Sequence, residues 1–350
     1  MAFKHKILLW YECYGRDLPW RKTDNPYHIW ISEIILQQTR IDQGLSYYTR
    51  FVEAFPTVSH LAEASEQEVL KLWQGLGYYS RARNLHAAAK SIVDERDGVF
   101  PDTYDGILAL KGVGKYTAAA IASFAFRMPY PVIDGNVYRV ISRVYGVYSP
   151  IGTASAYNQF EKILLNLIDV ERPDLFNQAI MDFGSVYCKP VSPDCVNCIF
   201  ASECVAYRND KVAMLPVKAA PPKVANRYFY YFDIQWVQDD GIFTIIGKRE
   251  SKDIWKGLYQ FPLLEKEFEE DAQARGLGSF LKDFCRVPFT VVSVSTPIVH
   301  KLTHRTIFAR FVKVNLSSEP LLDSGNWLKI PLDERSNYPV SRLIDKYLNG

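Results

Sequence analysis

The sequence lacks an excess of charge of either sign. Its 41 lysines and arginines face 39 aspartates and glutamates, which gives a formal net charge of +2. Residues 1–226 carry 24 basic and 23 acidic side chains, and residues 227–350 carry 17 and 16. No basic tail or block indicates a polyanionic partner. If such a partner exists, the basic side chains must be gathered on one face of the folded chain.

Long hydrophobic runs are also missing. The apolar stretch at the N-terminus is too short for a secretory signal, and no other stretch approaches membrane-spanning length. We therefore expect a soluble cytoplasmic protein with no membrane partner. Internal repeats and low-complexity tracts are absent as well. A length of 350 residues suggests two or three domains with ample core.

Cysteine is scarce and unevenly placed, which argues against a disulfide framework. Of six cysteines, Cys13 and Cys285 stand alone, and the other four form the pattern C-x6-C-x2-C-x5-C. These four are Cys188, Cys195, Cys198 and Cys204. Four close thiolates can hold one [4Fe–4S] cluster or one tetrahedral zinc ion. Zinc ribbons favour two C-x2-C pairs, and only one close pair is present here, so the spacing favours iron–sulfur.

The periodicity divides the chain into two kinds of structure. Residues 1–210 show helical spacing with capping signals, for example the box Ser65-x-x-Glu68. Residues 211–226, rich in proline and alanine, are typical of a linker. Residues 227–350 contain β-rich runs, and Asp239-Asp240-Gly241 between two of them predicts a hairpin. The prediction is an all-α domain followed by an α/β or α+β domain, of which the resemblance described below implies α/β.

Two glycines in Leu110–Ala118 predict a tight turn between helices. Gly112 and Gly114 allow consecutive backbone N–H groups to converge where the next helix begins, at Lys115. Such a turn can bind a phosphate group. The alternative is an ordinary glycine-rich turn. About twenty residues later follows Val132–Val137, a segment with an acidic residue just before an expected helix.

A carboxylic acid lies within a strongly apolar helical segment, Pro26–Arg40. On a helix, Trp30, Glu33 and Gln37 share one face and are surrounded by isoleucines and leucine. Burial disfavours the charged form, so the pKa of Glu33 should rise, as a general acid near neutral pH requires. The alternative is a solvated glutamate at the edge of a helix.

Together these motifs resemble the MutY-type adenine DNA glycosylases of the endonuclease III, or helix–hairpin–helix, superfamily. The resemblance includes Leu18-Pro19-Trp20-Arg21 and the Ser-Glu-x-x-Leu-Gln-Gln-Thr run that contains Glu33. It implies a helix–hairpin–helix lobe at about 21–127, an iron–sulfur lobe made of 1–20 with 128–210, and a structural [4Fe–4S] cluster. It also implies a monomer in the bacterial cytoplasm, associated with the nucleoid.

The resemblance also implies catalytic roles. Glu33 protonates adenine at N7, and Asp134 stabilises the oxocarbenium-like sugar that forms when the glycosidic bond breaks. Asp134 could instead serve only as a helix N-cap. Asn136 helps to organise the site. Tyr116 occupies the position where bifunctional relatives carry a Schiff-base lysine, which implies a monofunctional glycosylase.

Matching positions imply how the enzyme reaches a base inside duplex DNA carrying an 8-oxoguanine·adenine or guanine·adenine mispair. The target base must be flipped out. Gln38, Leu76 and Tyr78 match elements that enter the stack, and Arg21 and Gln178 match positions that contact the flipped adenine. The alternative for Leu76 and Tyr78 is a helix cap followed by core aromatics.

The last 124 residues resemble a MutT-like (Nudix) domain without its hydrolytic carboxylates. Asp253–Pro262 is similar to the family segment W-x-G-L-W-E-F-P, but Leu263 stands where a Nudix box has glutamate, and no R-E-x-x-E-E follows. We therefore expect binding without hydrolysis. The resemblance assigns 8-oxoguanine recognition to His300, Leu302, Thr303 and His304. The alternative for this segment is a strand end with satisfied histidines.

Three other functions remain open at this stage. One is an endonuclease III-like glycosylase and lyase that acts on oxidised pyrimidines. Another is a non-catalytic iron–sulfur protein that binds DNA, which the carboxylate pair Glu33 and Asp134 disfavours. The last is a nucleotide hydrolase, which the missing Nudix carboxylates disfavour.

Overall fold

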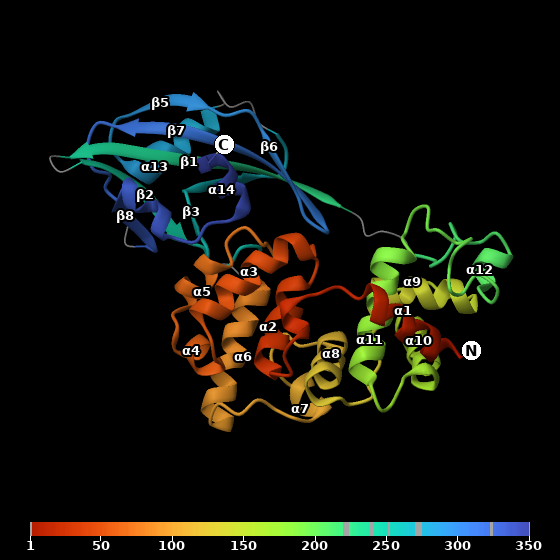
Figure 1. Cartoon of the computed structure of the whole chain (residues 1–350). Helices are drawn as coiled ribbons and strands as arrows, with labels where there is room; N and C mark the ends of the chain where they lie inside the picture. The colour runs from red at the N-terminus through yellow and green to blue at the C-terminus, as the bar shows by residue number, and fades with distance from the viewer. Residues whose placement is uncertain are drawn as a thin grey trace. The chain divides into compact units, whose positions relative to one another are not determined.

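The computed structural model divides into two compact units (Figure 1). The first consists of Met1–Glu63 with Asn84–Ala220, and the second of Ala64–Arg83 with Pro221–Gly350. The structure describes residues 2–219, 224–238, 241–250, 253–269, 275–322 and 325–349. Among them, every helix is too short or too polar to cross a lipid bilayer.

The chain before residue 220 is helical, as the periodicity predicts. A 3-10 turn, η1 (Pro19–Arg21), and a π-helical turn, η2 (Phe183–Tyr187), join longer helices. The predicted capping box is present: Glu68 N donates to Ser65 Oγ over 3.2 Å, and Ser65 N donates to Glu68 Oε2 over 2.8 Å. The α-helices are α1 (Phe3–Tyr14), α2 (Pro26–Leu36), α3 (Ile41–Ala54), α4 (Val58–Glu63), α5 (Glu66–Leu72), α6 (Ser80–Arg96), α7 (Tyr104–Leu108), α8 (Lys115–Phe126), α9 (Gly135–Tyr145), α10 (Ala154–Leu167), α11 (Pro173–Asp182) and α12 (Val205–Arg208).

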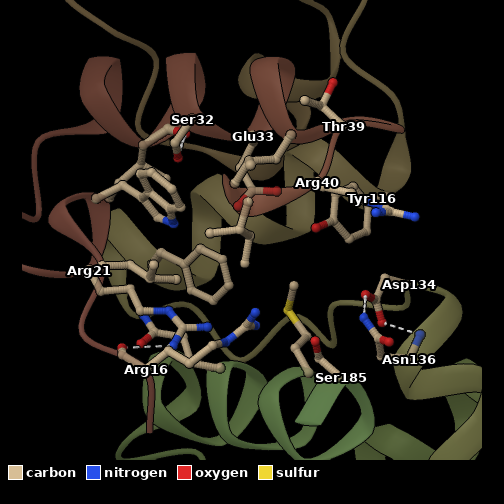
Figure 2. A pocket seen from close by; sticks show the side chains of 18 of the residues that line it. Arg16, Arg21, Ser32, Glu33, Thr39, Arg40, Tyr116, Asp134, Asn136 and Ser185 are labelled. Atoms are coloured by element: carbon tan, nitrogen blue, oxygen red, sulfur yellow. Dashed lines mark hydrogen bonds between the residues drawn. The ribbon is translucent and has the colours of Figure 1, made fainter. Parts of the chain in front are cut away.

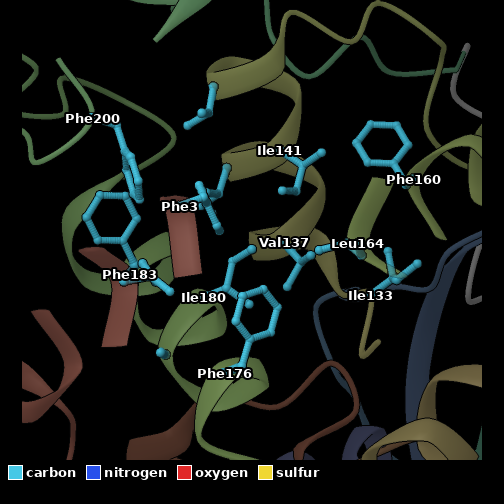
Figure 3. Packing of buried hydrophobic residues seen from close by; sticks show 14 of the residues in the cluster. Phe3, Ile133, Val137, Ile141, Phe160, Leu164, Phe176, Ile180, Phe183 and Phe200 are labelled. Atoms are coloured by element: carbon cyan, nitrogen blue, oxygen red, sulfur yellow. The ribbon is translucent and has the colours of Figure 1, made fainter. Parts of the chain in front are cut away.

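The first unit is built around α11, which packs against α1, α8 and α9. Phe3 of α1 lies in the same buried cluster as Phe176 of α11 and Phe200 (Figure 3). The start of the chain therefore packs against segments that come much later in the sequence. Helix α8 also packs against α2 and α7. Side chains of α2, α8, α9 and α11 can therefore face one another.

The predicted linker 211–226 is packed at its start. Leu215 is 2% exposed and lies in the α11 cluster, and Arg143 Nε donates to its carbonyl over 3.1 Å. Strand β1 already begins at Ala225, inside the predicted linker. An extended segment can bury single apolar side chains without periodicity, which is why the sequence pattern did not reveal this packing.

The second unit contains a mixed sheet in the order β3-β2-β1-β7-β5, with β4 paired to β1, β6 to β7 and β8 to β2. Strands β1 and β7 are parallel, and the other named pairs are antiparallel. The predicted hairpin is confirmed, because Gln238 pairs with Gly241; Asp239 and Asp240 lie outside the described residues. The elements are β1 (Ala225–Gln238), β2 (Gly241–Lys248), β3 (Tyr259–Gln260), β4 (Leu263–Lys266), α13 (Arg275–Cys285), β5 (Phe289–Val294), β6 (Ile298–Lys301), β7 (Arg305–Leu316), β8 (Trp327–Pro331), η3 (Asp333–Asn337) and α14 (Arg342–Asn349).

One helix covers each face of this sheet. Because strand side chains alternate between faces, Phe229 and Tyr231 pack in the cluster that contains residues of α14. Tyr230 and Phe232 point the other way and pack with residues of α13. Central strands buried on both faces are typical of an α/β layer arrangement, which confirms the fold class predicted for this part of the chain.

Candidate active site

A pocket of about 440 Å³ in the first unit collects the predicted catalytic and adenine-binding residues (Figure 2). Its walls come from η1, α2, α8, α11 and the start of α9. The predicted residues that line it are Arg21, Glu33, Tyr116, Asp134, Asn136 and Gln178. A volume of this size can hold one planar ring system together with a few directing polar groups.

Glu33 is held in the pocket by the way α2 begins. Asn25 caps the helix by accepting from Tyr27 N over 2.9 Å, and Pro26 fits the first helical position. Two turns later Glu33 is only 6% exposed. Burial, helped by the nearby Asp134, raises its pKa to about 7, although a hydrogen bond with Tyr116 and the charge of Arg21 act in the opposite direction. The pKa of Glu33 is thus shifted in the direction that its apolar segment predicts.

Tyr116 lies in the first turn of α8, and its ring faces the pocket (Figure 2). Burial and the neighbouring carboxyl groups raise its pKa well above the ordinary value, so its hydroxyl stays protonated and can donate to Glu33. The preceding residue, Lys115, points elsewhere, with Nζ 4.8 Å from the centre of the Tyr157 ring. An amine that could attack a sugar is thus absent from this position of the described pocket wall.

Asp134 is both a helix cap and a pocket residue. Its Oδ1 accepts from Asn136 N over 2.8 Å and from Val137 N over 2.7 Å, which caps α9. Its Oδ2 accepts from Asn136 Nδ2 over 2.6 Å. Burial raises its pKa, although these hydrogen bonds favour the charged form. The two alternatives weighed from the sequence are therefore compatible.

Asn136 is itself fixed from two sides. Arg139 Nη2 donates to Asn136 Oδ1 over 2.8 Å, and Arg139 Nε donates to the carbonyl of Cys188 over 2.8 Å. The π-helical turn η2 also lies against it. A Cβ at Gly184 would stand 2.6 Å from Asn136 Cβ and 2.8 Å from its carbonyl oxygen, so this close approach requires glycine. Asn136 therefore has little freedom to turn away from Asp134.

An ion-pair cluster that the sequence did not reveal holds Arg21 in the pocket wall. Asp182 is fully buried, and its two oxygens accept from Arg21 Nη1 and Nη2, each over 2.7 Å. Arg16 Nε and its backbone N donate to the same carboxylate over 2.9 Å. Burial opposes ionisation of Asp182, but these bonds lower its pKa below the ordinary value. Gln178 joins the cluster by accepting from Tyr11 Oη over 2.8 Å.

The sequence does contain a pattern that could have pointed to Asp182 as a pocket residue, although it does not indicate the ion pairs. It follows Gln178 by four residues on α11, so the two share a helix face. Ser185, on η2, is another lining residue that the sequence did not point to. A π-helical turn is not readable from residue periodicity, although such turns occur often at functional sites.

Other predicted residues lie outside the pocket lining. Gln38 follows α2, is exposed, and has a φ of 57°. Gly112 has a φ of 82°, and Gly114 is the N-cap of α8, with no side-chain cap on that helix. The first backbone amides of α8 are thus left for another partner, as the phosphate-binding prediction requires.

The two predicted wedge residues of the second unit differ in exposure. Tyr78 is 47% exposed with a φ of 48°, and its hydroxyl lies 3.2 Å from Thr303 Oγ1. Leu76 is only 8% exposed. Tyr78 is thus accessible in this structure and Leu76 is buried, and the role in the base stack predicted for both stays a prediction. The alternative of a helix cap followed by core residues predicts burial in this segment, and Trp73, Leu76 and Tyr79 are all buried.

The predicted recognition segment forms the end of β6 and the turn into β7. The ring of His300 lies 5.6 Å from the ring of Trp255, and burial lowers its pKa. Leu302 packs against the α14 cluster, whereas Thr303 and His304 are exposed. The turn therefore presents one hydroxyl and one imidazole to solvent. We name this turn, residues 302–304, the recognition loop.

The four clustered cysteines line one small pocket together with Arg143. Arg143 Nη1 donates to Cys188 Sγ over 3.4 Å, and Phe200 N donates to Cys198 Sγ over 3.4 Å. In the described part of the chain, no three His, Cys, Asp or Glu side chains are arranged to hold one metal ion. Four thiols around one pocket are a donor set that a [4Fe–4S] cluster or a zinc ion could use.

Asp182→Asn tests the buried cluster. The substitution leaves two arginines facing a neutral amide, and breaking a buried ion pair in this way costs about 3 to 5 kcal/mol of unfolding free energy. Urea denaturation followed by circular dichroism would measure the loss. Asp17→Asn, which removes an exposed pair with Lys22, is the control and should change stability by less than about 1 kcal/mol. Equal effects of the two substitutions would contradict this interpretation of Asp182.

Comparison with known proteins places the chain in a family. The family model described as HhH-GPD superfamily base excision DNA repair protein matches residues 31–166, and a NUDIX domain model matches residues 234–350. An adenine DNA glycosylase of Buchnera aphidicola subsp. Baizongia pistaciae is 32% identical over 99% of this chain and 97% of its own. One from Homo sapiens is 41% identical over 59% of this chain and 39% of its own.

Solved structures agree on the fold of the helical part. A thermostable thymine-DNA glycosylase superposes with a TM-score of 0.56 at 30% identity, covering 59% of this chain and 95% of that one. A trapped endonuclease III–DNA covalent intermediate superposes with a TM-score of 0.52 at 22% identity, covering 59% and 94%, which shows the fold alone. The chain therefore belongs to the adenine DNA glycosylase family, with an endonuclease III-type helical core joined to a NUDIX-like domain.

Proposed function

We propose that this protein hydrolyses the N-glycosidic bond of adenine that is mispaired with 8-oxoguanine or guanine in duplex DNA. The observation that carries the proposal is that two different acids line one pocket. Burial favours the protonated form of Glu33, whereas Asp134 accepts hydrogen bonds that favour its ionised form. Two carboxyl groups in different environments suit the two tasks of breaking a glycosidic bond, which are protonating the leaving group and stabilising a cation. The family relationship supports adenine as the base removed.

The chemistry divides between the two acids. Glu33 in its protonated form transfers a proton to N7 of adenine, so that the C1′–N9 bond can break with its electron pair moving to the base. The ionised Asp134 stabilises the positive charge that develops on the sugar. Water then bonds to C1′ and loses a proton, which leaves free adenine and an abasic deoxyribose. Once Glu33 has lost its proton, the hydroxyl of Tyr116 donates a hydrogen bond to the Glu33 carboxylate.

Elements outside the pocket would deliver the base. The uncapped start of α8 after Gly114 offers backbone amides to a DNA phosphate. The exposed Gln38 and Tyr78 are available to fill the space that a flipped base leaves. The recognition loop would contact the opposite base through Thr303 and His304, with Leu302 contributing packing and not an exposed ring.

The first test is excision from a duplex that holds one 8-oxoguanine·adenine pair, followed by alkaline cleavage at the abasic site. The wild type should release adenine, and Glu33→Gln should lower the single-turnover rate by roughly 100- to 10 000-fold, because the amide has no proton to give. Glu53→Gln changes an exposed glutamate of the same unit and should leave the rate unchanged. Full activity in Glu33→Gln would contradict the role of Glu33.

The same assay separates the alternatives. Cleavage of an oxidised pyrimidine, with a covalent DNA adduct trapped by borohydride, would favour an endonuclease III-like lyase. Tyr116 in place of a lysine leads us to expect no such adduct. Binding of duplex DNA without release of any base would favour a non-catalytic protein.

The pH dependence of excision follows from the two shifts. Because Glu33 must be protonated, the rate should fall as the pH rises through about 7, the pKa to which burial raises it. Because Asp134 must be ionised, the rate should also fall at low pH, at a point above its ordinary 3.8 since burial raises its pKa. Tyr116→Phe removes a hydrogen bond that favours ionised Glu33, so the alkaline limb should move to higher pH. An alkaline limb that stays in place would contradict the Tyr116–Glu33 interaction.

We further propose that Cys188, Cys195, Cys198 and Cys204 hold one [4Fe–4S] cluster. When bound, the cluster supplies a rigid link among the turns of residues 188–204 and takes no part in bond breaking. The thiol of Cys204 already donates to the carbonyl of Arg143 over 3.3 Å, and the donor set suits iron.

Cys198→Ser tests the cluster. The wild type should contain about four iron atoms per chain and absorb broadly in the visible region. The serine variant should lose much of both, because a thiolate ligand is gone. Cys13→Ser, at an exposed cysteine outside the loop, should keep both. Zinc in the wild type, or equal iron in the two variants, would exclude the proposed assignment.

A further inference from the structure

The recognition loop is short and is tied by its backbone at both ends. Leu302 N donates to the carbonyl of Arg305 over 2.7 Å, which closes the turn between β6 and β7. Ala225 N donates to the carbonyl of His304 over 3.0 Å, which fixes the turn to the start of β1. These bonds set the path of the backbone. They do not by themselves fix the direction in which the loop faces.

A single carboxylate beside the loop gathers three arginines. Asp253 Oδ1 accepts from Arg305 Nη1 over 2.5 Å, and its Oδ2 accepts from Arg227 Nη1 over 2.6 Å and Arg249 Nη2 over 3.2 Å. Arg305 is the residue that follows the recognition loop, whereas Arg227 and Arg249 come from β1 and the end of β2. The carboxylate therefore ties one end of the loop to two other parts of the sheet.

The segment that carries Asp253 also contacts the other end of the loop. Trp255, two residues later, has a φ of 61° and places its ring 5.6 Å from the ring of His300. Arg249 Nε donates to the carbonyl of Ile254 over 2.8 Å, which holds this segment in place between the two contacts. His300 and Arg305 bracket the recognition loop, so one segment braces it on both sides.

The charge on Asp253 persists over the working range of pH. Partial burial opposes ionisation, but hydrogen bonds from Arg227, the Ile254 amide and Arg305 hold the pKa of this carboxyl well below its ordinary range. Isolated surface pairs contribute little to stability, but networks of several charges with fixed geometry are the exception. Three guanidinium groups on one half-buried carboxylate form such a network.

We propose that Asp253 is a positioning residue for lesion recognition: by fixing Arg305 and, through Trp255, His300, it holds the recognition loop in one conformation that can contact the base opposite adenine. The inference rests on the proposed function, because it assumes that this loop distinguishes 8-oxoguanine from guanine. Asp253 acts through the loop and does not contact the base. Its loss should therefore affect discrimination between the two bases more than the bond-breaking step.

The experiment compares single-turnover excision of adenine opposite 8-oxoguanine and opposite guanine, using the full chain. In Asp253→Asn, the rate opposite 8-oxoguanine should fall by roughly tenfold more than the rate opposite guanine, as expected when a contact is misplaced by a fraction of an ångström. The matched control is Glu269→Gln, which removes an exposed acid that pairs with Arg310 of β7. This control should keep the wild-type ratio of the two rates.

A second variant guards against simple misfolding of the first. Arg305→Gln removes the tether at the loop and leaves Asp253 paired with Arg227 and Arg249. It should lower the same ratio, and the double variant should lose less than the product of the two single effects, because both act through one bond. Equal loss on both substrates, or a wild-type ratio in Arg305→Gln, would overturn the role of Asp253.

The two proposals fail in different ways. A wild-type protein that removes adenine equally well opposite both bases would overturn lesion recognition by the loop, and this inference with it. A wild-type protein that prefers 8-oxoguanine, together with variants that keep the full preference, would overturn only the role of Asp253.

Discussion

The burial of one carboxyl group, that of Glu33, is the constraint on which the rest of the helical unit depends. A rise in pKa from 4.5 to about 7 corresponds to about 3 kcal/mol between the two protonation states. Because the folded state binds the proton more tightly, the stability that Glu33 contributes is present below its unfolded pKa and is lost as the pH rises through about 7. The apolar packing of α2 and the hydrogen bond with Tyr116 must offset this loss of stability and keep Glu33 in the pocket.

Three acids of this unit show how the surroundings of a carboxyl group set its pKa. Glu33 has few partners, so burial dominates and its neutral form is favoured. Asp134 is half-buried, and the amides of α9 and the side chain of Asn136 support its charge. Asp182 faces two arginines and has a lowered pKa. In the proposed function, the proton donor, the cation stabiliser and the fixed counter-ion thus differ mainly in the groups that donate hydrogen bonds to them.

The residues that sequence reasoning found are those whose neighbours are close in the chain. Glu33 was visible from the apolar run around it, and Asp134 from the resemblance of its segment to that of the family. The pairing of Arg21 with Asp182 joins residues 161 positions apart, and no local pattern encodes it. Likewise, the helices and the β1–β2 hairpin could be predicted from the sequence, because each depends on residues close in the chain. The parallel pairing of β1 with β7 could not. Leu215 and Leu76 show the same limit, because burial of a single apolar residue outside a regular period depends on the tertiary fold.

The sheet unit keeps a NUDIX-like fold although its sequence departs from the hydrolytic motif of that fold. Leu263 stands where a Nudix hydrolase needs a carboxylate, yet the sheet, its two covering helices and its charged network are intact. Contacts with a base that does not react accelerate the chemical step only if they are stronger in the transition state than in the ground state. A braced loop costs less binding energy to order than a mobile one, which leaves more of that energy for contact with the base. Replacing an aromatic ring by Leu302 is tolerable on this view, since that side chain packs inward and the hydroxyl of Thr303 remains exposed.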